Sequence, residues 1–469
     1  MSSFDGIIIG SGQAATALAA GLAARGQRVA LVEGDKLGGT CVNSGCTPTK
    51  ALRKSARVAH LARRGVEFGV ATTGPVVVDF AAAMARMRAR SDTVRAELTA
   101  WLAGIDGVEV VGGWGRFEGR APDGQFRVAV GGHVLTAAKV YLNTGTRAFL
   151  PPGIEGALVL DNVGILALTE RPDHLIIVGG SYVGLEIGQI FRRLGASVTI
   201  VHRGARLAER EDPDVSDIIA DVMRAEGIDL RLNATVAGVG RNMRGVLATL
   251  VGGSEIVGSH ILFATGRAPN TGRLNLQSVG LEPDASGHIP TDGKLKTRVS
   301  GIWALGDING RGAFTHTSYH DHEIVLAELD GLTDLYQWRD AGQRPATYAM
   351  FTDPPLGRVG ISRAEAQALA AQGRKILISE MPMERIGRAK EESETTGLIR
   401  LIIDAETETF LGATILGFAG DEVIATLTNF MATGASYRVM QQALPVHPTV
   451  AEYLPTILAG LKPLEAPSD

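Results

Sequence analysis

Cysteine is almost absent from this 469-residue chain, whose two cysteines are Cys41 and Cys46. So few cysteines exclude a secreted scaffold held together by disulfides. Structural zinc is also disfavoured, because it normally needs four Cys or His ligands and no second thiol pair is present. The pair therefore indicates redox or nucleophilic chemistry, or else two buried thiols without a function.

The sequence also lacks a strong excess of charge of one sign and long uninterrupted apolar runs. The net charge is −4, with 20% charged and 45% hydrophobic residues, so no basic surface for nucleic acid or membrane is expected. The apolar stretch 6–24 follows Asp5 and is broken by Ser11, Gln13 and Thr16, unlike an export signal or a membrane span. We expect a cytoplasmic globular protein of roughly two to four domains, without nucleic-acid or membrane partners.

Residues 4–33 carry a phosphate-binding pattern: an apolar strand, a glycine turn, an alanine-rich helix and a second strand. Gly10, Gly12 and Ala15 fit G-x-G-x-x-[GA], in which the small residues allow a tight turn, close approach of a pyrophosphate, and helix packing. Glu33 follows where an acid can accept hydrogen bonds from an adenosine ribose. This segment predicts a dinucleotide site for a ribose with a free 2′-hydroxyl.

The pattern recurs in residues 174–203, with Gly179 and Gly184 at the outer positions and Ser181 at the middle one. The position of the acid is taken by His202, which would attract a 2′-phosphate that an acid would repel. The second site therefore favours NADPH over NADH, with a solvated basic loop as the alternative interpretation. The basic residues that follow are Arg203, Arg206 and Arg210.

Two dinucleotide units on one chain favour two cofactors that exchange electrons, a flavin in the first and a nicotinamide in the second. Two β-rich runs end in Thr-Gly, at Gly145 and Gly266, as expected where the chain crosses between the units. A third run ends at Asp307, whose carboxylate suits the hydroxyls of a ribityl chain, although it could equally cap a helix.

The cysteines lie in the glycine-rich stretch GGTCVNSGCTPTK, residues 38–50. On an ideal helix their spacing gives an axial rise of about 7.5 Å and different faces, so a Cys41–Cys46 bond needs a distorted turn. Gly45 could supply that distortion. We expect a helix that begins with Thr47 as its cap and Pro48 in its first turn, which would place Cys46 where the helix dipole favours a thiolate.

A thiolate couple also needs a proton donor, and His447 with Glu452, in LPVHPTVAEYLPTIL, is the preferred pair. We expect Glu452 to orient the imidazole from the start of a helix introduced by Pro448 and Thr449. The run 316–323, HTSYHDHE, competes as a metal site, but we favour a solvated helix face and expect no metal. Its histidines are His316, His320 and His322.

These motifs together resemble the class I flavoprotein disulfide reductases, the group of glutathione reductase, dihydrolipoamide dehydrogenase and mercuric reductase. The resemblance runs essentially end to end and rests on GSGQAA, GGTCVNSGCTPTK, GGSYVGLE, ATGRAPN, ALGD and HPTVAE. It implies an α/β fold with two Rossmann-like domains and a C-terminal α+β dimerisation domain. The implied segments are 1–148 (FAD), 149–268 (NAD(P)), 269–344 (FAD and central) and 345–469 (interface), and residues 397–417 are expected to form a hairpin.

The resemblance also implies a role for each matching residue. Cys41 would attack substrate, and Cys46 would face the flavin. His447 and Glu452 would form an acid–base pair that completes the active site of the other subunit in a homodimer. The remaining implied roles are a Lys50–Glu186 pair near the flavin, Tyr182 as a lid on the nicotinamide, Asp307 on the ribityl chain, Glu33 on the adenosine ribose, and Gly39 and Thr40 at the cofactor.

The expected activity is NADPH-dependent reduction of a small disulfide or similar acceptor through FAD and Cys41–Cys46. Residues 383–404 look most like the mercuric-reductase branch, which makes reduction of mercuric or other metal ions an alternative. However, the C-terminal cysteine pair of that branch is missing, so thiolate ligands for soft Hg²⁺ are few. A flavin-bound redox sensor with little turnover is the further alternative. Next to the cysteines, Leu52, Arg53 and Lys54 could contact an anionic disulfide or form a solvated face.

Overall fold

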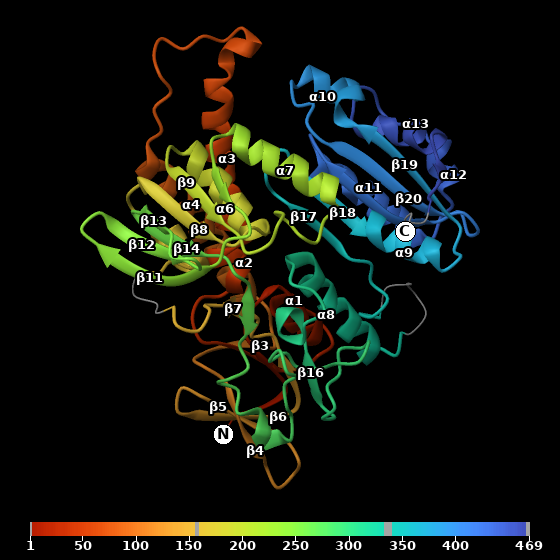
Figure 1. Cartoon of the computed structure of the whole chain (residues 1–469). Helices are drawn as coiled ribbons and strands as arrows, with labels where there is room; N and C mark the ends of the chain where they lie inside the picture. The colour runs from red at the N-terminus through yellow and green to blue at the C-terminus, as the bar shows by residue number, and fades with distance from the viewer. Residues whose placement is uncertain (1, 155–158, 333–339, 466–469) are drawn as a thin grey trace. The chain divides into compact units, whose positions relative to one another are not determined.

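The computed structural model describes residues 2–154, 159–332 and 340–465. The chain is mixed α/β, as the sequence predicts, and divides into two compact units (Figure 1). The first unit comprises Met1–Gly156, Leu160–Arg171 and Thr265–Arg344; the second comprises Ala157–Val159, Pro172–Ala264 and Pro345–Asp469. The finer division into four segments stays a prediction.

A largely parallel sheet forms the centre of the first unit, in the order β3-β2-β1-β6-β5-β4, with β16 beside β6. The strands β1, β2, β3, β6 and β16 pair in parallel, whereas β4 and β5 pair antiparallel. Residues 7–9 and 29–32 are buried without alternation, as expected for strands covered on both faces. The bounds are β1 (Ser2–Ile9), β2 (Val29–Glu33), β3 (Val108–Gly112), β4 (Arg116–Arg120), β5 (Phe126–Val130), β6 (His133–Leu142) and β16 (Ile302–Ala304).

Helices α1 and α8 lie side by side in the first unit (Figure 1). A Cβ on Gly21 would collide with Leu326 of α8, so a glycine lets the helices approach. Helix α3 packs on α4, whose first turn is capped by Asp79. The bounds are α1 (Gln13–Ala23), α2 (Gly39–Ser44), α3 (Cys46–Arg63), η1 (Gly65–Phe68), α4 (Phe80–Ala103), α5 (Asn162–Ala167), η3 (Leu276–Val279), η4 (Gly306–Asn309) and α8 (Thr315–Leu329).

The second unit contains a smaller parallel sheet in the order β10-β9-β8-β14, against which α6 and α7 pack. An antiparallel sheet, β11-β12-β13, accompanies it. This is the strand–helix–strand arrangement of a dinucleotide-binding fold. The bounds are β8 (His174–Val178), α6 (Tyr182–Arg193), β9 (Ser197–Val201), α7 (Pro213–Ala225), β10 (Asp229–Arg231), β11 (Val236–Asn242), β12 (Gly245–Leu250), β13 (Glu255–Gly258) and β14 (His260–Phe263).

The C-terminal part of the second unit is an antiparallel sheet in the order β17-β18-β21-β20-β19-β22. Strands β20 and β21 form the hairpin expected for residues 397–417. No described helix is long and apolar enough to cross a membrane. The bounds are β17 (Thr347–Met350), β18 (Leu356–Gly360), α9 (Arg363–Ala371), β19 (Ile376–Pro382), η5 (Met383–Arg385), α10 (Gly387–Glu391), β20 (Leu398–Asp404), β21 (Phe410–Leu416), α11 (Gly420–Thr433), α12 (Tyr437–Gln441), η6 (Ala451–Tyr453), α13 (Leu454–Ala459) and β22 (Lys462–Pro463).

Buried ion pairs join the two parts of the second unit. Arg400 of β20 is fully buried, and its guanidinium lies 2.7 Å from Asp212 at the start of α7 and 2.8 Å from Glu380. Asp214 also accepts a hydrogen bond from Arg400. Because a buried guanidinium needs compensating carboxylates, these contacts fix α7 against the C-terminal sheet.

Candidate active site

The first glycine turn connects β1 to α1 and leaves no room for a side chain at Gly10 or Gly12. Gly10 has φ +95°, a conformation that favours glycine, and a Cβ there would collide with the Asn143 carbonyl oxygen. A Cβ on Gly12 would lie 2.7 Å from Asn143 Oδ1. That oxygen is buried and finds no hydrogen-bond partner among the described residues. Ala15 is buried in α1, as the fingerprint predicts. The turn thus has the backbone geometry that a pyrophosphate needs.

Glu33 lies at the end of β2 and is held in place by neighbouring donors. The Ser11 backbone N–H donates to its carboxylate at 3.0 Å and the Asp35 N–H at 2.8 Å. The Ser11 hydroxyl also donates to Glu33 and accepts from Gly38 N–H at 3.1 Å. Ser11 therefore connects the glycine turn, the acid and the segment that leads to the cysteines.

Asp307 lies in η4, directly after β16. Burial raises the pKa of its carboxyl, while the nearby Arg267 and the hydrogen bond donated by Thr146 act in the opposite direction. A buried carboxylate gains from additional donors, such as ligand hydroxyls. The two Thr-Gly segments meet close by, since β7 (Thr146–Ala148) pairs antiparallel with β15 (Arg267–Pro269). Gly145 and Gly266 precede these strands, and both have positive φ.

The cysteines stand on two consecutive helices that break at Gly45. Cys41 lies in α2, and α3 begins at Cys46, with Gly45 at φ −138° and ψ −119° between them. A Cβ on Gly45 would lie 2.8 Å from the Thr40 carbonyl oxygen. The expected cap at Thr47 is wrong, because Gly45 takes the cap position and the helix begins at Cys46, whereas Pro48 lies in the first turn as expected. Cys46 consequently occupies the first helical position.

Both cysteines are in the thiol form, and Cys41 is half-buried whereas Cys46 is exposed. A hydrogen bond with Cys46, followed by burial, raises the pKa of Cys41 well above its usual range. Cys46 Sγ lies 3.1 Å from the hydroxyl of Thr315, the first residue of α8. Within the pair, the hydrogen bond and burial thus favour the protonated form of Cys41.

The cysteine segment and the glycine turn touch through two glycines. A Cβ on Gly39, at the start of α2, would lie 3.0 Å from Gly12 Cα. Thr40 is the next residue of α2, and Lys50 lies one turn beyond Cys46 in α3. Leu52 is fully buried, which excludes it as a surface contact within this unit, whereas Lys54 is exposed.

The second glycine turn connects β8 to α6. Gly179 has φ +122°, and a Cβ on Gly184 would collide with the Gly179 carbonyl, so the helix lies directly on the turn. Exposed Ser181 precedes α6 and half-buried Tyr182 begins it. His202 follows β9, and its Nδ1 accepts a hydrogen bond from Gly180 N–H at 3.1 Å.

The predicted Lys50–Glu186 pair has one member in each unit, so it stays a prediction. Glu186 is buried in α6, and its carboxylate accepts a hydrogen bond from Phe351 N–H at 2.8 Å. Gln189 makes the equivalent link one turn later, accepting from Asp353 N–H at 2.8 Å. The helix that carries Glu186 is thus anchored to the segment after β17.

His447 and Glu452 are brought together as expected, with Nδ1 2.8 Å from the Glu452 carboxylate. The His447 side chain is 80% exposed, whereas that of Glu452 is 15% exposed. Glu452 lies in the short 3-10 helix η6, which runs directly into α13 at Leu454, so it lies at the start of a helix as expected, although the first turn is 3-10 and not α. Glu452 therefore contacts Nδ1 of the His447 imidazole, and most of the ring remains exposed.

The histidine run 316–323 is solvated on one side only. It lies on α8, where His316 and Glu323 are exposed as expected, whereas Asp321 and His322 are buried. His316 stacks on Phe314, and Asp321 accepts a 2.6 Å hydrogen bond from Arg344. Among the described residues, no His, Cys, Asp or Glu group of three or more is arranged to hold a metal ion.

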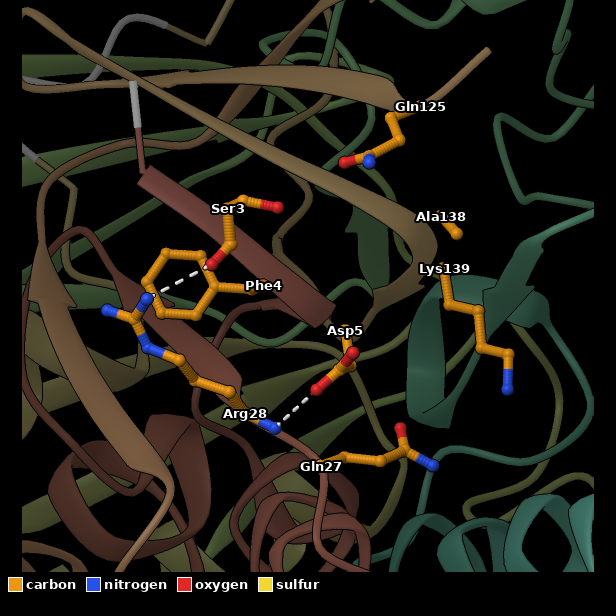
Figure 2. A pocket seen from close by; sticks show the side chains of 8 residues that line it. All are labelled: Ser3, Phe4, Asp5, Gln27, Arg28, Gln125, Ala138 and Lys139. Carbon is orange, nitrogen blue, oxygen red and sulfur yellow. Dashed lines mark hydrogen bonds between the residues drawn. The ribbon is translucent and has the colours of Figure 1, made fainter. Parts of the chain in front are cut away.

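A surface cleft of about 390 Å³ opens elsewhere on the first unit (Figure 2). Arg28 is one of its lining residues; its backbone N–H donates to the Asp5 carboxylate at 2.7 Å and its guanidinium to the Ser3 carbonyl at 3.2 Å. The cleft lies at the amino ends of β1 and β2, whereas dinucleotides bind at the carboxyl ends of such strands. It is therefore separate from the glycine turn. Its lining residues are Ser3, Phe4, Asp5, Gln27, Arg28, Gln125, Ala138 and Lys139.

Three residues of the site escape sequence reasoning. Ser11 occupies an unrestricted position of the glycine pattern, which gives no signal of its own. Asn143 precedes a Thr-Gly pair, and only its neighbour Gly145 attracts attention. Thr315 is 269 residues from Cys46 along the chain, and no local pattern reveals such a contact.

Two dinucleotide turns together with a cysteine pair at a helix start are typical of flavin-dependent disulfide reductases. Residues 4–321 match the model of the pyridine nucleotide-disulphide oxidoreductases, and residues 346–457 match the dimerisation domain of the same group. The chain belongs to the pyridine nucleotide-disulphide oxidoreductase family. Its members use FAD and a pyridine nucleotide.

The chain is similar to several relatives along nearly its whole length. The probable pyridine nucleotide-disulfide oxidoreductase RclA of Escherichia coli K12 is 31% identical, over 98% of this chain and 100% of RclA. A mercuric reductase of Streptomyces lividans is 34% identical, over 96% of this chain and 94% of that enzyme. The solved structure of RclA, described as an HOCl-induced flavoprotein disulfide reductase, superimposes with a TM-score of 0.86 over 97% of this chain and 99% of that one, at 31% identity.

Proposed function

We propose that this protein is an NADPH-dependent disulfide reductase that passes electrons through FAD and the Cys41–Cys46 pair to a small disulfide or similar acceptor. The observation that carries the proposal is the thiol geometry: Cys46 begins α3 beside Thr315 and is hydrogen-bonded to Cys41, and this hydrogen bond raises the pKa of Cys41. Such asymmetry suits one nucleophilic and one charge-bearing thiol.

The residues present fit FAD in the first unit. Gly10 and Gly12 would accept the pyrophosphate, because neither position has space for a Cβ. Glu33 would accept hydrogen bonds from the adenosine ribose, and Asp307 would accept them from the ribityl hydroxyls. Bound FAD would supply two-electron transfer between the nicotinamide and the cysteine disulfide. Gly39, Thr40, Gly145 and Gly266 are proposed to line the same site.

In the half of the cycle in which the substrate is reduced and the cysteine pair is oxidised, the chain's own residues handle the thiol chemistry. Cys41 loses its proton to a base and attacks a substrate disulfide, which forms a mixed disulfide and releases one thiolate. Cys46 then attacks Cys41 Sγ, which releases the second thiol and restores the Cys41–Cys46 disulfide. Because the pKa of Cys41 is raised, it needs a base held in position; His447, oriented by Glu452, would act in the active site of the other subunit of a homodimer.

The nicotinamide coenzyme is proposed to bind at the second glycine turn, over Gly179, Ser181 and Gly184. Tyr182 would cover the nicotinamide, and Glu186 would pair with Lys50 at the flavin. NADPH is preferred because the position after β9 carries His202 instead of an acid, and exposed basic residues follow it. Those residues are Arg203, Arg206 and Arg210.

Anaerobic titration with NADPH tests the proposal. The wild type and Cys41→Ser should both develop the long-wavelength absorbance band of a thiolate next to oxidised flavin, and Cys46→Ser should lack it. Persistence of the band in Cys46→Ser would contradict the assignment of the two thiols. A parallel titration with NADH tests the coenzyme, and a panel of disulfides defines the acceptor.

Reduction of a metal ion is the second candidate, supported by the 34% identity to a mercuric reductase and by a solved Cu(II) complex of RclA. Cys41 and Cys46 would supply the thiolates. This candidate predicts that Hg²⁺ or Cu²⁺ stimulates NADPH consumption in the wild type but not in Cys41→Ser. Absence of stimulation across thiol-buffered metal concentrations would eliminate it. A redox sensor would instead show turnover near zero with every acceptor.

A further inference from the structure

The loop after β9 contains one acidic residue among its basic ones. Residues 202–210 read HRGARLAER, in which Glu209 is the acid. The Glu209 carboxylate folds back over Gly204, where an added Cβ would collide with it. It also lies 3.6 Å from His202 Nε2. The Glu209 carboxylate thus lies next to His202, the residue that stands where a ribose-binding acid is expected in the glycine pattern.

The orientation of His202 is fixed from the other side. Its Nδ1 accepts the Gly180 N–H, so in the neutral imidazole the proton resides on Nε2. That nitrogen is buried and has no hydrogen-bond partner among the described residues, with Glu209 just beyond hydrogen-bond distance. The Nε2–H of neutral His202 is therefore a donor that lies beside the Glu209 carboxylate.

Backbone hydrogen bonds hold the loop in this shape. Ala208 N–H donates to the Gly180 carbonyl at 2.8 Å, Asn233 N–H to Gly204 at 2.9 Å, and Ala234 N–H to His202 at 2.9 Å. The loop is thus tied both to the second glycine turn and to the segment after β10. Glu209 follows directly after the first of these ties, and its side chain is 52% exposed.

We infer that Glu209 is a specificity-determining residue of the coenzyme site, where its carboxylate opposes the 2′-phosphate of NADPH. The inference rests on the proposed function, in which that phosphate lies beside His202 and Arg203. Two anions in the same space repel each other, and the repulsion is weakened by water because Glu209 is half exposed. The loop therefore combines attraction by its basic residues with an opposing charge, and NADPH affinity is held below what the basic residues alone would give.

Binding of two coenzyme fragments to the holoenzyme tests this without turnover. Calorimetry with 2′,5′-ADP and with 5′-AMP compares the same adenosine with and without the 2′-phosphate. Glu209→Gln should tighten 2′,5′-ADP binding about fivefold to tenfold and leave 5′-AMP within about twofold. Arg203→Gln should weaken 2′,5′-ADP. Glu255→Gln, the same change at an exposed position of β13, serves as the matched control and should alter neither fragment.

Unchanged affinity of Glu209→Gln for 2′,5′-ADP would overturn the inference. So would a selective loss of 5′-AMP binding, which would make Glu209 an acceptor for the ribose hydroxyls. Failure of the proposed function has a different signature: the wild type itself would bind 5′-AMP more tightly than 2′,5′-ADP, whatever the variant does.

Discussion

The hydroxyl of Thr315 offers a direct test of how the chain sets the charge on Cys46. It lies 3.1 Å from Cys46 Sγ, and a hydroxyl that donates to a thiolate favours the charged form. Thr315→Val removes the donor with little change in volume. A hydrogen bond to a charged group contributes about 1.5–3 kcal/mol, and we take the lower end because Cys46 is exposed. Since about 1.4 kcal/mol corresponds to one pKa unit, the pKa of Cys46 should rise by about one unit.

The assay is the pH dependence of alkylation in a Cys41→Ser background, where Cys46 is the remaining thiol. The rate follows the thiolate fraction, so the profile of Thr315→Val should shift to higher pH, and Thr315→Ser should restore the original profile. In the flavin-loaded enzyme the long-wavelength band should shift in parallel. An alkylation profile identical in Thr315→Val and its parent would refute the argument that Thr315 stabilises the thiolate.

Three further predictions concern neighbouring features. Gly45→Ala should lower the free energy of unfolding by about 1–3 kcal/mol, because its Cβ would lie 2.8 Å from the Thr40 carbonyl, whereas Gly74→Ala, with open space around it, should be neutral in the same thermal melt. Glu452→Gln should lower kcat about tenfold or more without changing the KM for NADPH, since it disturbs only the orientation of His447; equal effects on both constants would contradict this role. Arg400→Met should destabilise the fold by about 3–5 kcal/mol at neutral pH, because buried Asp212 loses its ion-pair partner. Burial raises the pKa of Asp214, but the hydrogen bond and charge of Arg400 outweigh burial, so the net pKa of Asp214 is lowered. The stability that Asp214 gains from Arg400 is therefore present above about pH 4 and is lost below it. Urea unfolding should accordingly show that the difference in stability between Arg400→Met and the wild type shrinks in acid.

Features with a local signal were predicted well from the sequence. The glycine turns at Gly10 and Gly179 combine small residues with flanking apolar strands, and the hairpin around residues 398–416 has its own apolar pattern. His447 and Glu452 lie five residues apart, so their contact needs only a short turn. In each case the chain's neighbours in sequence are also its neighbours in space.

The rest depends on contacts between distant segments. Helix α3 begins at Cys46, before the expected position, because Gly45 packs closely against Thr40, and residue preferences do not predict such a contact. His322 appeared to lie on a polar face, yet packing in the first unit buries it. Asn143 and Thr315 contact segments that are distant in the sequence. Their contacts become apparent only in the folded structure, in which Asn143 follows β6 and Thr315 begins α8.

The contact between Gly12 and Gly39 has a consequence for how such a protein can change. A methyl group on Gly39 would press on the backbone of the nucleotide turn, and one on Gly12 would press on Asn143. Substitution of Gly39 would therefore widen the separation between the turn and the helix that bears Cys41, and substitution of Gly12 would push the turn away from Asn143, even though neither glycine performs chemistry. Saturation mutagenesis should therefore find almost no tolerated substitution at Gly12 or Gly39. Accepted substitutions in the surrounding loop should be those that keep both glycine contacts.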